Sequence, residues 1–155
     1  MKEYLIGCDN AAVALKNEII NLLKAHRLPF TDVGVASEED DTFYPEIARR
    51  VAEGIIDSRY EKEGILLCGT GIGMAITANK FPGIYAAVCH DIYSAERARL
   101  SNNTNVITMG ARVVAPELAK KILAEWLNLE FKPGRSSEKI ALIKSYEERN
   151  FRKTS

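Results

Sequence analysis

A cysteine followed by a glycine-rich turn offers the clearest chemistry in this chain. Residues 66–73 read Leu-Leu-Cys-Gly-Thr-Gly-Ile-Gly, so Cys68 ends an apolar run and Thr70 lies inside the turn. We expect the apolar run to be a buried strand and residues 74–80 to form the start of a helix. The backbone N–H groups of such a turn favour bound anions and developing negative charge, and the helix start favours the thiolate form of a cysteine. These residues therefore predict a reactive sulfur beside an anion-binding loop.

The elements that must position this sulfur alternate between strand and helix. We expect strands at residues 4–8, 30–35, 64–68, 84–89 and 106–109, and helices at 12–25, 45–58, 73–80, 92–101, 116–127 and 136–148. Repeated β-α-β units predict an α/β fold with a parallel, five-stranded sheet and helices on both faces. In such folds ligands bind beyond the carboxyl ends of the strands.

Polar and reactive residue types follow four of the predicted strands. Asp9 and Asn10 come after the first strand, Cys68 ends the third, His90 follows the fourth, and Arg112 follows the fifth. Because the carboxyl ends of parallel strands meet at one edge of the sheet, we expect these side chains to lie close together.

Composition sets the class of protein. The chain has 155 residues, 46% of them hydrophobic, which suits one compact domain over residues 1–148 and excludes a disordered chain. A basic tail is expected at 149–155, and the helix at 136–148 lies beyond a Pro-Gly break from which it could pack on a partner subunit.

Charge and cysteine content indicate which binding partners and which cell compartment the chain favours. Lysine plus arginine and aspartate plus glutamate both total 21, so net charge gives no argument for nucleic acid or an anionic membrane. No apolar run is long enough to span a bilayer, and the N-terminus lacks a signal-peptide pattern. Three widely spaced cysteines argue against a disulfide framework and favour a cytoplasmic location, and no zinc-binding pattern is present. We expect no bound metal.

The glycine-rich turn fits other phosphate-binding motifs poorly. Gly69, Gly71 and Gly73 give a G-x-G-x-G spacing, one residue shorter than the dinucleotide fingerprint G-x-G-x-x-G. The turn lacks the lysine of a P-loop. A cysteine-dependent phosphatase would need an arginine after the loop, where this chain has Met74.

Several of these residues also have ordinary structural explanations. A free cysteine is often a small buried hydrophobe, which is our preferred reading of Cys89 and an open one for Cys8. Asp9 could simply cap the helix that follows it. Arg112 and Arg135 could be surface cations, although two guanidinium groups suit the oxygens of a phosphate.

The motifs resemble those of type B ribose-5-phosphate isomerase and its relatives, the galactose-6-phosphate isomerase subunits. The resemblance covers residues 2–148, with motifs in the same order: Gly7-Cys8-Asp9, Tyr44-Pro45, Cys68-Gly69-Thr70-Gly71-Ile72-Gly73, Ala78-Asn79-Lys80, Tyr93-Ser94-Ala95, Asn102-Asn103-Thr104-Asn105, Gly110-Ala111-Arg112-Val113-Val114 and Gly134-Arg135. It implies a Rossmann-like three-layer α/β/α sandwich. It also implies a homodimer or dimer of dimers with active sites at the subunit interface, and a reaction on a sugar phosphate without a metal or other cofactor.

The resemblance also implies roles for individual residues. Cys68 matches the base that removes the proton next to the carbonyl, and Thr70 matches a hydroxyl that helps ring opening or orients the sugar. The loop that stabilises the enediolate matches Gly69, Gly71, Ile72 and Gly73. Asp9, Tyr44 and Asn102 match sugar contacts, and Arg112 and Arg135 match phosphate contacts. We expect substrate contacts at Asp9, Asn10, Tyr44, Ser101, Asn102, Arg112, Arg135 and Lys139.

The chain departs from the ribose-phosphate pattern where that family has imidazoles. Asn10 and Ser101 stand in place of histidines, and the one lost at Ser101 is usually assigned to opening the furanose ring. Lys139 replaces a phosphate-binding arginine. Serine and asparagine cannot act as general acids near neutral pH as imidazole does. Either another group such as His90 opens the ring, or the substrate is an open chain that needs no such help.

We therefore expect a metal-independent aldose–ketose isomerase. The most favoured substrate pair is ribose 5-phosphate and ribulose 5-phosphate, or a related pentose, tetrose or hexose phosphate. The alternative is a non-catalytic protein that binds sugar phosphates, or an accessory subunit of a hetero-oligomeric isomerase.

Overall fold

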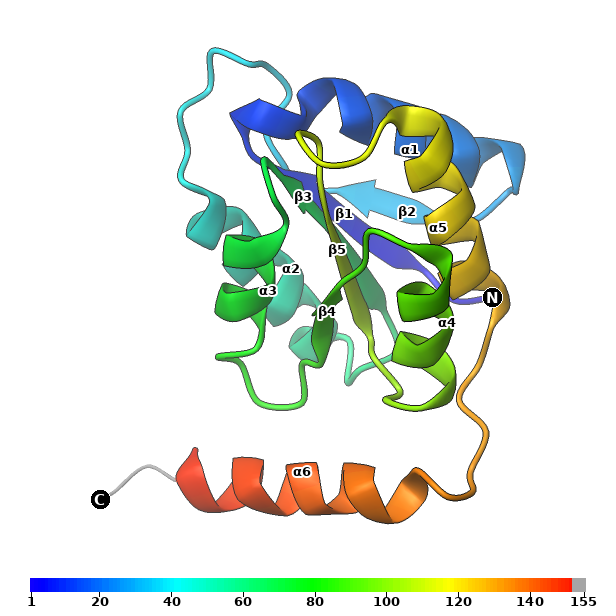
Figure 1. The fold of residues 1–155 in the computed structure, drawn as a ribbon. Helices are drawn as coiled ribbons and strands as arrows, with labels where there is room; N and C mark the ends of the chain where they lie inside the picture. Colours follow the sequence, from blue (N-terminus) through cyan, green and yellow to red (C-terminus); the bar gives the residue numbers. More distant parts are fainter. Residues whose placement is uncertain (152–155) are drawn as a thin grey trace.

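The computed structural model describes residues 1–151 and contains one sheet of five parallel strands (Figure 1). The strands are β1 (Tyr4–Cys8), β2 (Phe30–Asp32), β3 (Glu63–Cys68), β4 (Ala86–Val88) and β5 (Val106–Gly110), in the order β2-β1-β3-β5-β4. The helices are α1 (Val13–Ala25), α2 (Tyr44–Asp57), α3 (Ile72–Ala78), α4 (Ile92–Leu100), α5 (Pro116–Asn128) and α6 (Ser137–Asn150). The predicted α/β fold with a five-stranded parallel sheet is confirmed.

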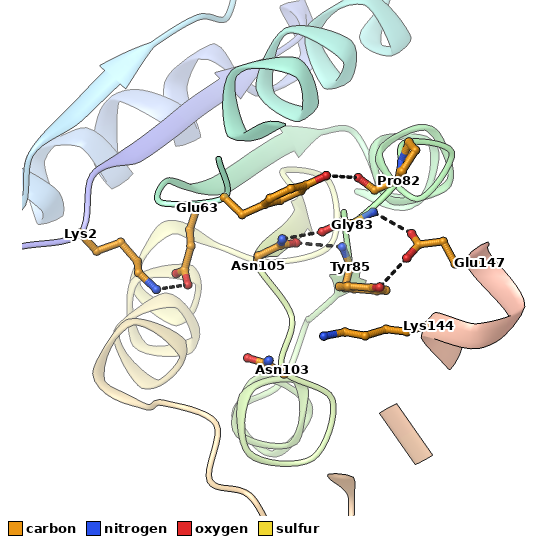
Figure 2. Close-up of a pocket in the computed structure, with 10 residues that line it drawn as sticks. Lys2, Glu63, Pro82, Gly83, Tyr85, Asn103, Asn105, Lys144 and Glu147 are labelled. Atoms are coloured by element: carbon orange, nitrogen blue, oxygen red, sulfur yellow. Dashed lines mark hydrogen bonds and ion pairs between the residues drawn. The ribbon is translucent and has the colours of Figure 1, made fainter. Parts of the chain in front are cut away.

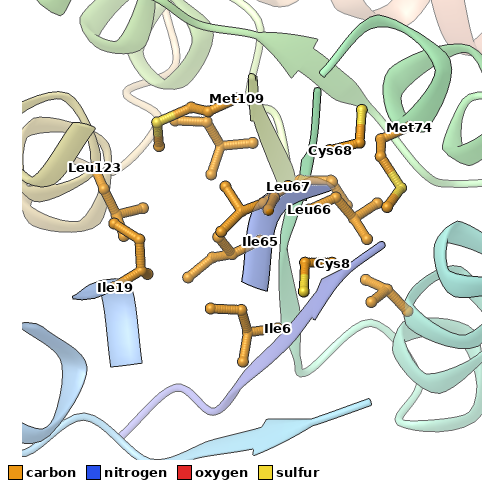
Figure 3. Packing of buried hydrophobic residues seen from close by; sticks show 14 of the residues in the cluster. Ile6, Cys8, Ile19, Ile65, Leu66, Leu67, Cys68, Met74, Met109 and Leu123 are labelled. Carbon is orange, nitrogen blue, oxygen red and sulfur yellow. The ribbon is translucent and has the colours of Figure 1, made fainter. Parts of the chain in front are cut away.

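Two helix layers cover the sheet, as a three-layer α/β/α sandwich requires. Helices α2 and α3 pack on one face, and α1, α4 and α5 pack on the other (Figure 1). The three central strands are buried along their whole length, which explains their continuous apolar runs. Figure 3 shows Ile6, Ile65 and Leu67 on the side of the sheet that faces Ile19 of α1 and Leu123 of α5, with Met74 of α3 on the other side.

The edge strands are shorter than predicted. Strand β2 ends at Asp32 instead of residue 35, because the Asp32 carboxylate accepts a hydrogen bond from the Gly34 N–H at 2.9 Å and turns the chain. Strand β4 covers only Ala86–Val88, and the Asn79 side chain bonds both backbone groups of Ala86 in place of a further strand. The other elements agree with prediction to within a few residues.

Helix α6 lies across the amino edge of the sheet, outside the two layers (Figure 1). Its Glu147 carboxylate accepts hydrogen bonds from the Gly83 N–H at 2.7 Å and from the Tyr85 hydroxyl at 2.6 Å. Its Leu142, Ile143 and Tyr146 side chains are exposed. The helix continues to Asn150, past the predicted end at residue 148, and residues 152–155 of the expected tail lie outside the described residues.

Candidate active site

Cys68 is the last residue of β3, at the carboxyl end of the strand, and the residue is 4% exposed. The Gly71 N–H donates a hydrogen bond to Sγ, with an N–S distance of 3.1 Å. Gly71 makes this bond in the left-handed region, at φ +75°, and a Cβ there would lie 2.9–3.1 Å from the backbone of Met109. A side chain at this position would therefore be strained and would also clash with β5.

Thr70 presents its hydroxyl at the exposed side of the same loop. Its Oγ1 accepts a hydrogen bond from the Ile72 N–H at 3.3 Å. Because this bond uses a lone pair of the oxygen, the hydroxyl proton is left to donate to a bound molecule. The loop thus holds one sulfur and one hydroxyl, each oriented by a backbone amide.

The end of β5 fixes the loop and brings a cation to it. Hydrogen bonds of 2.8 Å from the Ala111 N–H to the Cys68 carbonyl and of 3.0 Å from the Arg112 N–H to the Gly69 carbonyl join the two segments. A Cβ at Gly110 would lie 2.5 Å from the Thr70 Cα, so only glycine allows this approach. The exposed Arg112 guanidinium lies over Gly69, since a Cβ on that glycine would be 3.1 Å from an Nη atom.

Two further side chains flank the loop. The Asp9 carboxylate accepts a hydrogen bond from the Ala11 N–H at 3.0 Å and so caps the 3-10 turn at Asn10–Ala12, as its structural explanation predicted. Tyr44 begins α2, and its ring lies against Gly73, where a Cβ would come within 2.3 Å of the ring.

A cavity of about 440 Å³ joins these groups. It is lined by Asp9, Asn10, Ala11, Tyr44, Cys68, Gly69, Thr70, Ile72, Gly73, Ile76 and Arg112. Nine of the predicted site residues thus line one cavity. Gly71 does not line it but donates a hydrogen bond to the Cys68 sulfur. Ala11 and Ile76 were not predicted to line the site. Ile76 lies one helical turn after Ile72, a spacing that could have indicated it.

Four predicted substrate contacts lie elsewhere in this chain. Ser101 and Asn102 follow the last residue of α4, and Arg135 and Lys139 lie just before and inside α6. Ser101 and Asn102 lie at the amino edge of the sheet, because a helix that follows a parallel strand runs back to that edge, and α6 lies across the same edge (Figure 1). Within one chain these four residues do not line the Cys68 cavity.

His90 does not line the cavity either. Its Nε2 accepts a hydrogen bond from the Gly110 N–H at 2.9 Å. Burial lowers the pKa of His90, and the neutral ring is the form in which Nε2 can accept a hydrogen bond. The imidazole therefore supports the end of β5, and the hypothesis that it opens a sugar ring finds no geometric support.

A larger cavity of about 570 Å³ lies at the amino edge, between the sheet and α6 (Figure 2). Its polar side chains are largely paired with one another. Glu63 binds Lys2 at 2.6 Å, and Glu147 binds Gly83 and Tyr85. The lining contains no cysteine or histidine. The Cys68 cavity is therefore the candidate active site.

The three cysteines differ in a way that alkylation will detect. Burial raises the pKa of Cys8 and of Cys89 to about 11, and both side chains are enclosed in the core. At pH 8 only about one molecule in a thousand would then carry either thiolate. We expect iodoacetamide to label Cys68 first, because its sulfur lines a cavity, and peptide mass mapping over time will show the order. Equal labelling of all three sites would contradict this prediction.

Residues 1–151 offer no candidate for a membrane span or a metal site. No helix in this range combines the length and apolar character that crossing a membrane requires. No group of three histidine, cysteine, aspartate or glutamate side chains in this range is placed to hold a metal ion.

Known proteins resemble this chain in sequence and in fold over most of its length. The family model described as Ribose/Galactose Isomerase matches residues 4–143. A D-erythrulose-4-phosphate isomerase of Pectobacterium atrosepticum is 50% identical over 147 residues, which are 95% of this chain and 96% of that protein. A ribose-5-P isomerase B of Listeria innocua is 48% identical over 145 residues, 94% of this chain and 97% of that protein. The structure of Clostridium thermocellum ribose-5-phosphate isomerase B superposes with a TM-score of 0.90 at 37% identity, covering 95% of this chain and 98% of that one.

Proposed function

The chain belongs to the ribose/galactose isomerase family, and is thus an aldose–ketose isomerase of sugar phosphates; we propose that its Cys68 transfers the proton and that a four-carbon sugar phosphate is its preferred substrate. The observation that carries the choice of substrate is the absence of an imidazole at the Cys68 cavity.

The proposed reaction moves one carbon-bound proton. The Cys68 thiolate removes the proton from C2 of the aldose, and the electron pair forms the double bond of an enediolate. The same thiol then returns the proton to C1, which leaves the carbonyl at C2. The Thr70 hydroxyl, with its oxygen already bonded by the Ile72 N–H, donates to the enediolate oxygen and relays the proton between O1 and O2.

Hydrogen-bond donors and a cation are placed to stabilise the negative charge of the enediolate in this cavity. The Arg112 guanidinium lies over Gly69, and the Thr70 hydroxyl belongs to the same cavity lining. A well-placed donor of this kind lowers an enediolate-forming barrier by about 3 kcal/mol. Since the Gly71 N–H is bonded to Sγ, it stabilises the thiolate before proton transfer begins.

We propose that a second copy of the chain completes the site. Four predicted contacts lie at the amino edge of the sheet, opposite the cavity: Ser101, Asn102, Arg135 and Lys139. Only another copy of the chain can bring them to this cavity. The cavity lining includes Ile72 and Ile76, which are 54% and 57% exposed, and Phe43, next to the lining residue Tyr44 in the chain, is 81% exposed. A partner covering these side chains would also exclude water from the reacting carbons.

The missing histidines favour a substrate that does not close a furanose ring. In a tetrose 4-phosphate the O4 that would close the ring carries the phosphate, so the aldehyde is available without ring opening. Ribose 5-phosphate cyclises, and its opening calls for a general acid. Asn10 stands at the cavity where the family pattern has a histidine, Ser101 replaces the other, and His90 is held by Gly110.

The test compares D-erythrose 4-phosphate with D-ribose 5-phosphate, each followed in both directions by NMR. We expect kcat/KM to be at least about tenfold higher for the four-carbon pair, since loss of a general acid costs roughly a hundredfold for the ring-closed substrate. Ser101→His is the matched variant, and it should raise turnover of ribose 5-phosphate selectively. Equal or better turnover of ribose 5-phosphate by the unaltered protein would refute the four-carbon assignment.

A further inference from the structure

One hydroxyl of the core contacts the catalytic loop and has no part in the reaction described above. Thr108 lies in the middle of β5 and is fully buried. Its Oγ1 donates a hydrogen bond of 2.8 Å to the Gly71 carbonyl, 37 residues away in the sequence. A buried hydroxyl without a partner is costly, so this bond is what makes a threonine acceptable at the centre of an apolar strand.

The Thr108 hydrogen bond is made to Gly71, the residue whose N–H binds the Cys68 sulfur. Gly71 uses its N–H to bind the Cys68 Sγ and its carbonyl to accept the Thr108 hydroxyl. The same carbonyl accepts the Ala75 N–H at 3.1 Å, which ties Gly71 to α3. Among residues 1–151, only the Thr108 bond ties that carbonyl to the sheet. Strand β5 lies directly beside Cys68, since Cys68 pairs with Gly110.

We propose that Thr108 is a positioning residue for the isomerase reaction: its hydroxyl fixes the Gly71 peptide so that the Gly71 N–H stays directed at the Cys68 sulfur. This inference rests on the proposed role of Cys68 as the base. An N–H bond to sulfur favours the thiolate over the thiol. Loss of the Thr108 hydroxyl lets the Gly71 amide turn away, and the sulfur then gives up its proton less readily.

Other charged groups near Cys68 are left in place by this change. Asp9, Tyr44 and Arg112 line the same cavity from β1, α2 and β5, and His90 approaches Gly110 from the end of β4. None of the four is bonded to Thr108. A shift in the titration of Cys68 on changing Thr108 therefore reports on the Gly71 bond.

The experiment measures Cys68 alkylation by iodoacetamide against pH, beside kcat against pH, in Thr108→Val and Thr108→Ser. Valine has the shape of threonine without the hydroxyl, and serine keeps the hydroxyl. We expect valine to raise the pH midpoint of alkylation by about half a unit to one unit. The alkylation rate and kcat at pH 7 should then fall by about three- to tenfold, and serine should restore both.

A purely structural role gives a different result. It would lower the thermal midpoint and reduce kcat equally at every pH, with the alkylation midpoint unchanged, and this outcome would overturn the proposal, as would a serine variant shifted as far as valine. If valine prevents folding, Thr108→Ala replaces it. Alkylation is read without turnover, so a failure of Cys68 as the base, seen as an active Cys68→Ala enzyme, is distinguishable from a failure of the Thr108 bond.

Discussion

Replacing Cys68 with alanine is expected to reduce isomerisation about a thousandfold, the usual scale for loss of a general base. Backbone amides of the glycine loop hold two side chains of the cavity, Cys68 and Thr70, and a thiol is far more acidic than a hydroxyl, so the thiol is the group suited to act as the base. Asp9 also lines the cavity, but its carboxylate accepts the Ala11 N–H and caps the 3-10 turn. The rate is measured as interconversion of the aldose and ketose phosphates, and the proton-transfer step as exchange of substrate hydrogen with heavy water.

Matched cysteine variants make the result specific. Cys68→Ser keeps the shape of the site and supplies a hydroxyl far less acidic than a thiol, so it is expected to be nearly as inactive as the alanine variant. Cys89→Ala removes a cysteine that is 1% exposed and outside the cavity, and we expect it to keep kcat within about twofold. A Cys68→Ala protein within tenfold of the original rate would show that another group is the base.

The same exchange measurement distinguishes an isomerase from the alternative, a protein that binds sugar phosphates without converting them. A protein that only binds sugar phosphates would release no substrate hydrogen to heavy water even at high protein concentration. An isomerase exchanges it whatever product accumulates, because exchange reports the first proton transfer. Lack of exchange with every sugar phosphate offered, by protein shown to be folded, would favour the accessory-subunit alternative.

Much of the fold could be predicted because its three central strands are buried on both faces. Continuous apolar runs such as residues 64–68 and 106–109 leave little choice between strand and loop, and parallel connections then determine which ends carry the chemistry. Asp9, Cys68 and Arg112 were predicted to share one edge, and the structure places all three around one cavity.

Tertiary contacts account for what sequence patterns could not predict. Whether Gly110 must be glycine depends on a loop 40 residues earlier, because Thr70 lies where a Cβ would be. The place of α6 depends on the extended segment after α5 and on Glu147 reaching Gly83. Polar residues in buried strands, such as Thr108 in β5 and Glu63 in β3, indicate that a partner is needed but do not identify the residue that supplies it.

The distance between the Cys68 cavity and Ser101 follows from the same topology. Matching single residues to family motifs predicts which residues contact the substrate, but it does not show which copy of the chain supplies each of them. The alternation of strand and helix does so for Ser101 and Asn102, since it places the end of α4 at the amino edge. The single-chain structure therefore divides the predicted contacts into those at the carboxyl edge and those at the amino edge.

The largest effect on stability is expected at the amino edge, where a buried ion pair lies beneath the start of β3. The Arg99 guanidinium binds both carboxylate oxygens of Glu63, one of them at 2.9 Å, and both residues are 5% exposed. It also donates to the Trp126 carbonyl at 2.9 Å and to the Thr104 carbonyl at 2.7 Å, and it lies 3.5 Å from the Trp126 ring centroid. Every acceptor around it is thus satisfied by a single side chain.

Arg99→Met is expected to lower the free energy of unfolding by about 3–5 kcal/mol, because it leaves a buried carboxylate and two carbonyls without their donor. The partly exposed Lys2 also binds Glu63 at 2.6 Å, which places the expected loss at the lower end of that range. For a chain of this length the thermal midpoint should fall by about 10 °C. Urea unfolding and a thermal scan measure both quantities.

The double variant Glu63→Leu with Arg99→Met decides whether the pair itself stabilises the fold. Removing both charges eliminates the cost of burying them, and an apolar pair of similar volume is often as stable as the ion pair it replaces. We expect the double variant to recover at least half of the loss seen in Arg99→Met alone. If it is as unstable as the single variant, the carbonyls of Thr104 and Trp126, which lose their donor in both proteins, account for the stability, and the ion pair contributes little.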